Sequence, residues 1–170
     1  MVKNYYKVTL TKLGWIGLCW SSRGLSRCTL PAQTYSEAFY SLGINRDETE
    51  VSSDDSFLKS LTLGLDDYFR RKNTFLNFEI DLIGTYFQKM VWQTVLSIPY
   101  GSTRSYSWVA KRIGSPGSYR AVGQALKANP IAIFVPCHRI IAADGSLGGY
   151  AGTSGLGMKR DLLKLEGYIH

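Results

Sequence analysis

The stretch SYSWVAKRIGSPGSYRAVGQALKANP, residues 105–130, decides the fold. Its apolar spacing predicts one helix from residue 105 or 106 to 113 and another from 118 to about 128. Residues 114–117, GSPG, form the turn between them, and Asn129 before a proline stops the second helix. Two short helices around a glycine turn predict a helix-turn-helix, although such hairpins also occur in proteins that never touch DNA.

A cysteine follows this stretch. Residues 131–135, IAIFV, predict a buried strand that leads into Pro136-Cys137-His138-Arg139-Ile140-Ile141. The thiol of Cys137 would then be fixed at the end of the strand. Cysteine is a strong nucleophile only as a thiolate, and His138 could act as its base while Arg139 adds positive charge. For the dipeptide alone, a packed cysteine beside a chance histidine is the alternative.

The segment before residue 105 predicts another helix and a domain boundary. Apolar residues recur at helical spacing from residue 87 to 98, and Pro99-Tyr100-Gly101 stops the helix. Gly84-Thr85 is the best boundary. We therefore expect a supporting N-terminal α/β domain over 1–84 and a C-terminal domain over 85–170 that contains the helix-turn-helix and Cys137.

The first 84 residues contain no catalytic motif. Their patterns predict a hairpin over 7–20 and 25–30, a helix over 35–43, a surface loop over 45–55, a helix that opens at 54–56 and runs through 69, and an extended stretch over 75–83. The expected fold class is α/β (α+β), in which this sheet-and-helix domain precedes a mainly helical domain with a helix-turn-helix.

The net charge of +7 lies in the second half of the chain. Residues 1–84 hold 10 basic and 10 acidic side chains, whereas residues 85–170 hold 10 basic and 3 acidic ones. A basic domain suits a polyanionic partner, because neutralised phosphates release counterions. A basic surface that only aids solubility is the alternative.

The three cysteines form no CxxC pair, and there are only two histidines, so we expect no structural zinc site. Cys19 and Cys28 could face each other across the first hairpin in one register, but two reduced, buried thiols are the favoured interpretation. No apolar run is long enough for a membrane span and the N-terminus has no signal core, so we expect a cytoplasmic protein.

The motif at Cys137 resembles a known family. Pro-Cys-His-Arg followed by two aliphatic residues is the signature of the O6-alkylguanine-DNA alkyltransferases, also called methylated-DNA-protein-cysteine methyltransferases. The similarity runs from Thr85 to about Tyr168, while residues 1–84 resemble the family only in layout. It includes Arg120-Ala121-Val122-Gly123, Asn129-Pro130, Gly148-Gly149-Tyr150 and Leu165-Glu166-Gly167.

The resemblance implies a Cys-His-Glu relay. Cys137 would accept the alkyl group irreversibly, once per molecule, His138 would be its base through a bound water, and Glu166 would orient His138. Asn129 would brace the site. For Glu166 a solvated residue near a helix end is the alternative, and for Asn129 a plain helix stop.

The resemblance also implies that the damaged nucleotide is flipped out of the duplex. Arg120 resembles the arginine finger that fills the gap, with Ala121, Gly123 and Ala125 allowing close approach to the minor groove. Tyr106 matches a tyrosine that pushes the target phosphate and donates a hydrogen bond to the leaving guanine. A solvated arginine and a half-buried aromatic are the alternatives.

Four residues are expected to wall the pocket: Val135, Gly149, Tyr150 and Ala151. Tyr150 would stack on the base. Lys159 also matches a family lysine near the pocket, but a solvated helix face explains it almost as well.

Two positions depart from the family pattern. Ala132 stands where many members have a second proline, so larger adducts would bind differently. Tyr119 replaces a small residue before Arg120 and would alter the fit to the minor groove.

The expected partner is double-stranded DNA containing O6-alkylguanine, bound by a monomer without cofactor, metal or membrane. Three other functions are possible: a module that binds alkylated DNA without transfer, a helix-turn-helix regulator, and a Cys-His hydrolase.

Overall fold

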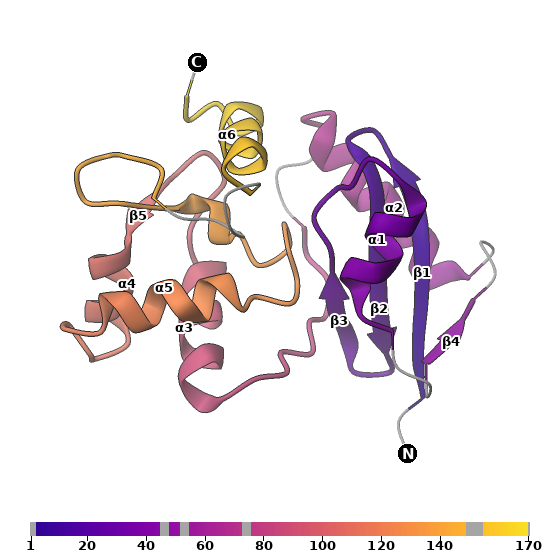
Figure 1. The fold of residues 1–170 in the computed structure, drawn as a ribbon, viewed down its shortest axis with the longest axis horizontal. Coiled ribbons are helices and arrows are strands. Elements are labelled where there is room, and N and C mark those ends of the chain that lie inside the picture. Colours follow the sequence, from indigo (N-terminus) through magenta and orange to yellow (C-terminus); the bar gives the residue numbers. More distant parts are fainter. Residues whose placement is uncertain (1–2, 45–47, 52–54, 73–75, 149–154, 170) are drawn as a thin grey trace. The chain divides into compact units, whose positions relative to one another are not determined.

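The computed structural model describes residues 3–44, 48–51, 55–72, 76–148 and 155–169. It divides the chain into two compact units: unit 1 holds residues 1–82 with 130–132, and unit 2 holds 83–129 with 133–170 (Figure 1). Unit 1 combines a sheet with helices and unit 2 is mainly helical, which confirms the predicted α/β class.

The sheet of unit 1 has the strand order β3-β2-β1-β4. Strands β1 (Asn4–Thr11), β2 (Gly14–Ser21) and β3 (Gly24–Cys28) are antiparallel neighbours, as the hairpin pattern predicted, and β4 (Glu48–Glu50) lies parallel to β1. The prediction of a surface loop over 45–55 is therefore wrong at β4. The side chain of Glu48 on β4 forms an ion pair with Arg27 of β3, which stabilises the position of β4.

Two helices cover opposite faces of this sheet. Helix α1 (Tyr35–Leu42) packs on the face that carries Cys19, whereas α2 (Ser56–Phe69) begins beneath Trp20 on the other face. Both helices occur where the apolar spacing predicted them. Each has a side-chain cap, from Thr34 and Asp55 respectively.

The alternation of side chains along the strands separates two cysteines. Cys19 lies opposite Arg27, and Cys28 lies opposite Leu18, so the two thiols point to opposite faces of the sheet. Both are buried and free, which confirms the favoured interpretation of reduced thiols.

Two further segments complete unit 1. The predicted extended stretch runs beside β3, where Leu25 N donates to Glu79 O at 2.8 Å and Asp81 N donates to Leu25 O at 2.9 Å. Residues 130–132 pair with Cys28 through hydrogen bonds of 2.9 Å on either side.

Unit 2 contains the predicted helix-turn-helix. Helix α3 (Tyr86–Leu96) begins with a capping box between Thr85 and Gln88, and α4 (Tyr106–Arg112) and α5 (Tyr119–Lys127) flank the glycine turn. The Trp92 indole on α3 donates to Ala125 O on α5 at 2.8 Å, which ties the second helix of the motif to the core of the unit.

The remaining elements of unit 2 surround the cysteine. A single 3₁₀ turn, η1 (Cys137–Arg139), precedes β6 (Ile140–Ile141), which pairs in parallel with β5 (Arg104–Ser105). Helix α6 (Gly155–Leu165) follows. None of the helices in the described ranges is long and apolar enough to span a membrane.

The predicted strand over 131–135 is wrong. Only Ile131 makes a bridge, and a turn follows in which Ile133 takes a φ of 72°. All five residues are buried. A short apolar run reports burial and cannot by itself distinguish a strand from a buried turn.

Candidate active site

Cys137 is the first residue of η1 and is only 3% exposed. Its backbone N–H donates to Val135 O at 2.8 Å, which closes a tight turn centred on Pro136. Burial raises the pKa of the Cys137 thiol to about 12, although a hydrogen bond with Asn129 and the charge of Lys159 act in the opposite direction. The resting group is therefore a thiol at neutral pH, and a reaction must remove its proton.

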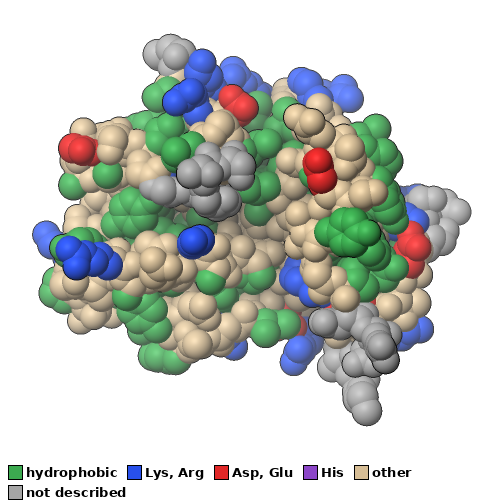
Figure 2. All heavy atoms as spheres, viewed as in Figure 1, with side chains coloured by type: hydrophobic (Ala, Val, Ile, Leu, Met, Phe, Trp, Pro, Cys, Tyr) green, Lys and Arg blue, Asp and Glu red, His purple; other side chains and the backbone are tan. Residues whose placement is uncertain are grey.

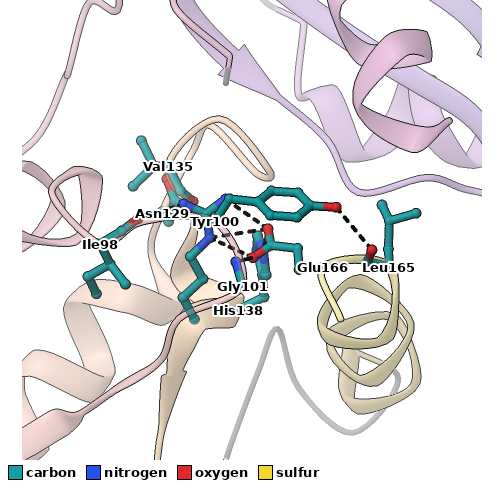
Figure 3. Close-up of polar contacts among 9 residues, drawn as sticks. Ile98, Tyr100, Gly101, Asn129, Val135, His138, Leu165 and Glu166 are labelled. Carbon is teal, nitrogen blue, oxygen red and sulfur yellow. Dashed lines mark hydrogen bonds and ion pairs between the residues drawn. The ribbon is translucent and has the colours of Figure 1, made fainter. Parts of the chain in front are cut away.

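His138, the residue after Cys137, forms a buried pair with Glu166. The His138 Nε2 lies 2.8 Å from Glu166 Oε1, and both side chains are fully enclosed (Figure 3). Burial raises the pKa of Glu166, but hydrogen bonds and charge from His138 and Arg139 outweigh that effect and bring the pKa to about 2. Glu166 is therefore a carboxylate that accepts from Nε2–H.

This pairing sets the state of the imidazole. Burial lowers the pKa of His138, against the opposing effect of Glu166, so the ring is neutral at neutral pH. With the proton on Nε2, the lone pair is on Nδ1. Nδ1 is the atom that can take up a proton.

Arg139 holds the carboxylate from the other side. Its Nη2 donates to Glu166 Oε1 at 2.8 Å, and its Nε donates to Glu166 Oε2 at 2.9 Å. Its Nη1 donates to Ile98 O at 2.7 Å, and the guanidinium lies 5.8 Å from the centroid of the Tyr100 ring. Arg139 was expected to add positive charge near the thiol of Cys137. In the structure its guanidinium instead forms an ion pair with the carboxylate of Glu166.

The loop after α3 supplies another contact to the same carboxylate. Gly101 N donates to Glu166 Oε2 at 2.9 Å, and the close-up shows the carboxylate between Gly101 and His138 (Figure 3). Gly101 has a φ of +71°, and a β-carbon there would lie 3.0 Å from Glu166 O, so both backbone and space favour glycine. The stop signal Pro-Tyr-Gly thus also builds the site.

Asn129 joins the end of α5 to the cysteine. Its Nδ2 donates to Val135 O at 3.0 Å, and its side chain hydrogen-bonds with the thiol of Cys137. Asn129 therefore both ends the helix region and contacts the thiol.

Lys159 on α6 is fully buried, so the interpretation as a solvated helix face is wrong. Its ammonium donates to Ile140 O and to Leu147 O. Burial lowers its pKa to about 8, and the nearby Cys137 acts against that shift. A helical signal was available: Lys159 shares the spacing of the buried α6 residues, which are Gly155, Lys159, Leu162 and Leu163.

Tyr106, the first residue of α4, is half-buried beside the same site. Burial and the proximity of Cys137 raise the pKa of its hydroxyl, which therefore stays protonated. A β-carbon at Gly148 would lie 3.0 Å from that hydroxyl, and one at Gly123 would lie 3.8 Å from the ring. Because neither glycine has a side chain, both leave space for the ring and hydroxyl of Tyr106.

Three of the expected DNA-contacting residues lie on the exposed side of α5, whereas Gly123 is half-buried and Ala125 is buried, so the expectation that Ala125 allows close approach to DNA is wrong. Tyr119, Arg120 and Ala121 are exposed, while the buried side of the helix carries Val122, Ala125 and Leu126. The Arg120 guanidinium lies 5.9 Å from the centroid of the Tyr119 ring. The structure therefore separates these residues from the buried group around Cys137.

Of the expected pocket wall, Val135 is buried next to Cys137. Gly149, Tyr150 and Ala151 lie outside the described residues.

Together the fold and the site define a helix-turn-helix protein with a buried thiol beside a histidine-glutamate pair. The family model described as "6-O-methylguanine DNA methyltransferase, DNA binding domain" matches residues 86–168. A methylated-DNA–protein-cysteine methyltransferase of Methanosarcina acetivorans is 49% identical over 113 residues, which are 66% of this chain and 71% of that protein. The chain belongs to the methylated-DNA–protein-cysteine methyltransferase family.

Other relatives agree. The protein of that name from Mycobacterium leprae is 56% identical over 102 residues, 60% of this chain, and the match spans only 61% of the relative's length. The crystal structure of Mycobacterium tuberculosis OGT in complex with DNA has a TM-score of 0.80 and 39% identity, and covers 95% of this chain and 92% of that one. The O6-methylguanine-DNA methyltransferase of Pyrococcus kodakaraensis has a TM-score of 0.62 and 26% identity over 96% of this chain and 99% of that one.

Proposed function

We propose that this protein repairs DNA by transferring the alkyl group of O6-alkylguanine to Cys137, irreversibly and once per molecule. The observation that carries the proposal is the buried hydrogen bond between His138 Nε2 and Glu166 Oε1, because His138 directly follows the buried Cys137 in η1. A nucleophile whose neighbour is a base, with the base fixed by a carboxylate, is the arrangement that activated thiols require. Family membership supports the same reaction.

The thiol proton leaves through His138. Nδ1 accepts it by way of a water, and Glu166 stabilises the imidazolium that forms, because its carboxylate remains ionised. Lys159 and Asn129 favour the thiolate as it develops, since both already oppose the raised pKa of the thiol. Burial keeps the resting group protonated, so the thiolate forms only as reaction begins.

The transfer itself is a displacement at carbon. A bond forms between Sγ and the alkyl carbon while the bond from that carbon to O6 breaks, and its electron pair moves onto the guanine. The Tyr106 hydroxyl, which stays protonated, donates a hydrogen bond to the departing base. The proton taken from the thiol ends on the guanine, so the products are guanine and an S-alkylcysteine.

The buried thiol can reach a base only if the base leaves the stack. We propose that α5 lies in the minor groove and that Arg120 fills the vacated position. The exposed Arg120 beside the small Ala121 supports this, since a long cation next to small side chains allows close approach. The N-terminal residues 1–84 would then support the domain over 85–170 that binds DNA and reacts.

One experiment distinguishes the possibilities. The protein is incubated with duplex DNA carrying labelled O6-methylguanine and then digested for mass mapping. One equivalent of label on Cys137 supports repair. Binding without label would favour a recognition module or a helix-turn-helix regulator, and repeated turnover would favour a hydrolase.

A further inference from the structure

Two arginines contact the ring of Trp108 on α4: Arg104, on β5 just before the helix, and Arg112, the last residue of the helix. The guanidinium carbon of Arg104 lies 5.5 Å from the Trp108 ring centroid, and that of Arg112 lies 5.8 Å from it. Trp108 and Arg112 are four residues apart on α4 and so lie on one side of the helix, and the contact of Arg104 with the same ring places it on that side too. Both arginines are exposed and Trp108 is half-buried.

The proposed alkyl transfer does not use this side of α4. Val109 and Ala110 are buried on the inner side, and Tyr106 faces Gly123 and the Cys137 site.

A shallow pocket of about 320 Å³ lies beside this arrangement. Arg104 and Trp108 line one part of it, and Ala142, Ala143 and Gly145 of the turn after β6 line another. The parallel pairing of Arg104 with Ile140 holds the two parts together. The site is therefore formed by two segments far apart in sequence.

The chemistry of the arginines indicates the ligand. A guanidinium can donate two parallel hydrogen bonds to a phosphate, and stacking on an aromatic ring restricts its motion before binding. An arginine that is already restricted loses less side-chain entropy when it binds. Two such groups near a small pocket suit an extended phosphate chain better than a single small anion.

The charge nearby favours an anion. Lys and Arg side chains are spread over the face of unit 2 in view (Figure 2), and residues 85–170 contain 10 basic against 3 acidic side chains. Asp144, in the turn at the pocket, is the opposing charge. Its Oδ1 accepts from Ser146 N at 2.9 Å, which holds it toward its own turn.

We infer that Arg104 and Arg112, braced on Trp108, bind backbone phosphates of duplex DNA in addition to the contact made by α5. In helix-turn-helix proteins the first helix crosses the DNA backbone while the second enters a groove. The inference rests on the proposed function in taking DNA as the ligand, but it does not depend on alkyl transfer.

The test is equilibrium binding of the full-length protein to undamaged duplex DNA over a series of salt concentrations. Arg104→Gln and Arg112→Gln should each reduce the slope of log K against log salt by about 0.9 for each phosphate that the variant no longer neutralises. Trp108→Leu keeps both charges and should weaken binding at every salt concentration, because the arginines are no longer held.

Arg160→Gln is the matched control, since Arg160 is an exposed arginine on α6 of the same unit. Its slope should equal that of the unmodified protein. Asp144→Asn should tighten binding. A wild-type slope in both Arg104→Gln and Arg112→Gln, or an equal reduction in Arg160→Gln, would overturn the inference.

The two proposals fail separately. Transfer from free O6-alkylguanine base to Cys137 needs no phosphate and is measured on the unmodified protein. Absence of that label would count against the proposed repair reaction and leave the salt test unaffected.

Discussion

His138 Nε2 and Glu166 Oε1 are 2.8 Å apart although their residues are 28 positions apart in sequence. Glu166 follows α6, and His138 lies in the turn after Cys137, so the pair joins the end of α6 to the reactive turn. Arg139 and Gly101 occupy the remaining lone pairs of the carboxylate. Glu166 therefore fixes the tautomer of His138 and also holds three segments of unit 2 together.

Replacing either member of this pair should slow alkyl transfer. We expect His138→Gln and Glu166→Gln to reduce the single-turnover rate about 10²-fold or more, the usual size of a proton-transfer contribution. The measurement is label transfer to Cys137 from duplex DNA at saturating protein. Rates equal to wild type in both variants would refute the relay.

Cys137→Ser should abolish transfer while binding to alkylated DNA is retained. A hydroxyl is a far weaker nucleophile than a thiolate, whereas the proposed contacts of α5 are unchanged. Binding and label transfer are measured on the same DNA. Transfer at the wild-type rate in this variant would show that another residue accepts the alkyl group.

Acid should destabilise the folded protein in two windows. The pKa of His138 is lowered on folding from its ordinary 6.5, so its contribution is present above that pH and is lost as the unfolded chain takes up a proton below it. The pKa of Glu166 falls from 4.5 to about 2, so its contribution is lost as pH falls between those values.

Urea denaturation from about pH 8 down to about pH 2 measures these losses, because that range covers both windows. In Glu166→Gln the free energy of unfolding should no longer fall in the lower pH range. It should still depend on pH near the ordinary pKa of histidine. An unchanged profile in that variant would show that Glu166 does not contribute in the way its surroundings require.

Arg139→Gln should destabilise the protein by about 3–5 kcal/mol, because it leaves the buried charge of Glu166 without its guanidinium. Arg139→Lys restores the charge but not the forked geometry, so the loss should be smaller. The exposed Arg160→Gln should change the free energy of unfolding by less than about 0.5 kcal/mol. Similar losses in Arg139→Gln and Arg160→Gln would contradict the proposed bracing.

Arg120→Ala should affect paired lesions most. If Arg120 fills the vacated stack, the variant should slow repair of a lesion in a normal duplex far more than attack on the free base, and a lesion opposite a mismatch should be partly rescued. Single-turnover rates at saturating protein on the three substrates test this. Equal losses on all three would contradict the assignment, as would a loss that disappears at high protein concentration, which indicates a phosphate contact.

The sequence predicted those parts of the fold whose signals are local. The helix-turn-helix followed from apolar spacing, a glycine turn and a proline stop, all of which act within a few residues. The conformation of residues 131–135 could not be predicted in the same way. These apolar residues are buried, but they form a turn at Ile133 and not a strand of a sheet. The strand β4 also depends on a partner that is distant in sequence, because it forms by pairing with β1.

The candidate site shows the same division. Cys137 and His138 are adjacent, so their motif is visible in the sequence. The role of Arg139 became clear only from its contacts with Glu166 and Ile98, which are remote along the chain. Lys159 could have been identified by its position among buried residues of α6, but a charged residue is rarely expected in a core.

If Cys137 accepts an alkyl group as proposed, the burial of every cysteine provides a chemical measure of that reaction. Cys19, Cys28 and Cys137 are all free and enclosed, so a bulky thiol reagent should find no target on the folded chain. Once the chain is unfolded, all three sulfurs become available to the reagent. A molecule that has accepted an alkyl group keeps it as a thioether, which such reagents do not modify. Colorimetric titration in denaturant would therefore count spent molecules directly, as one missing thiol per chain, without any labelled DNA.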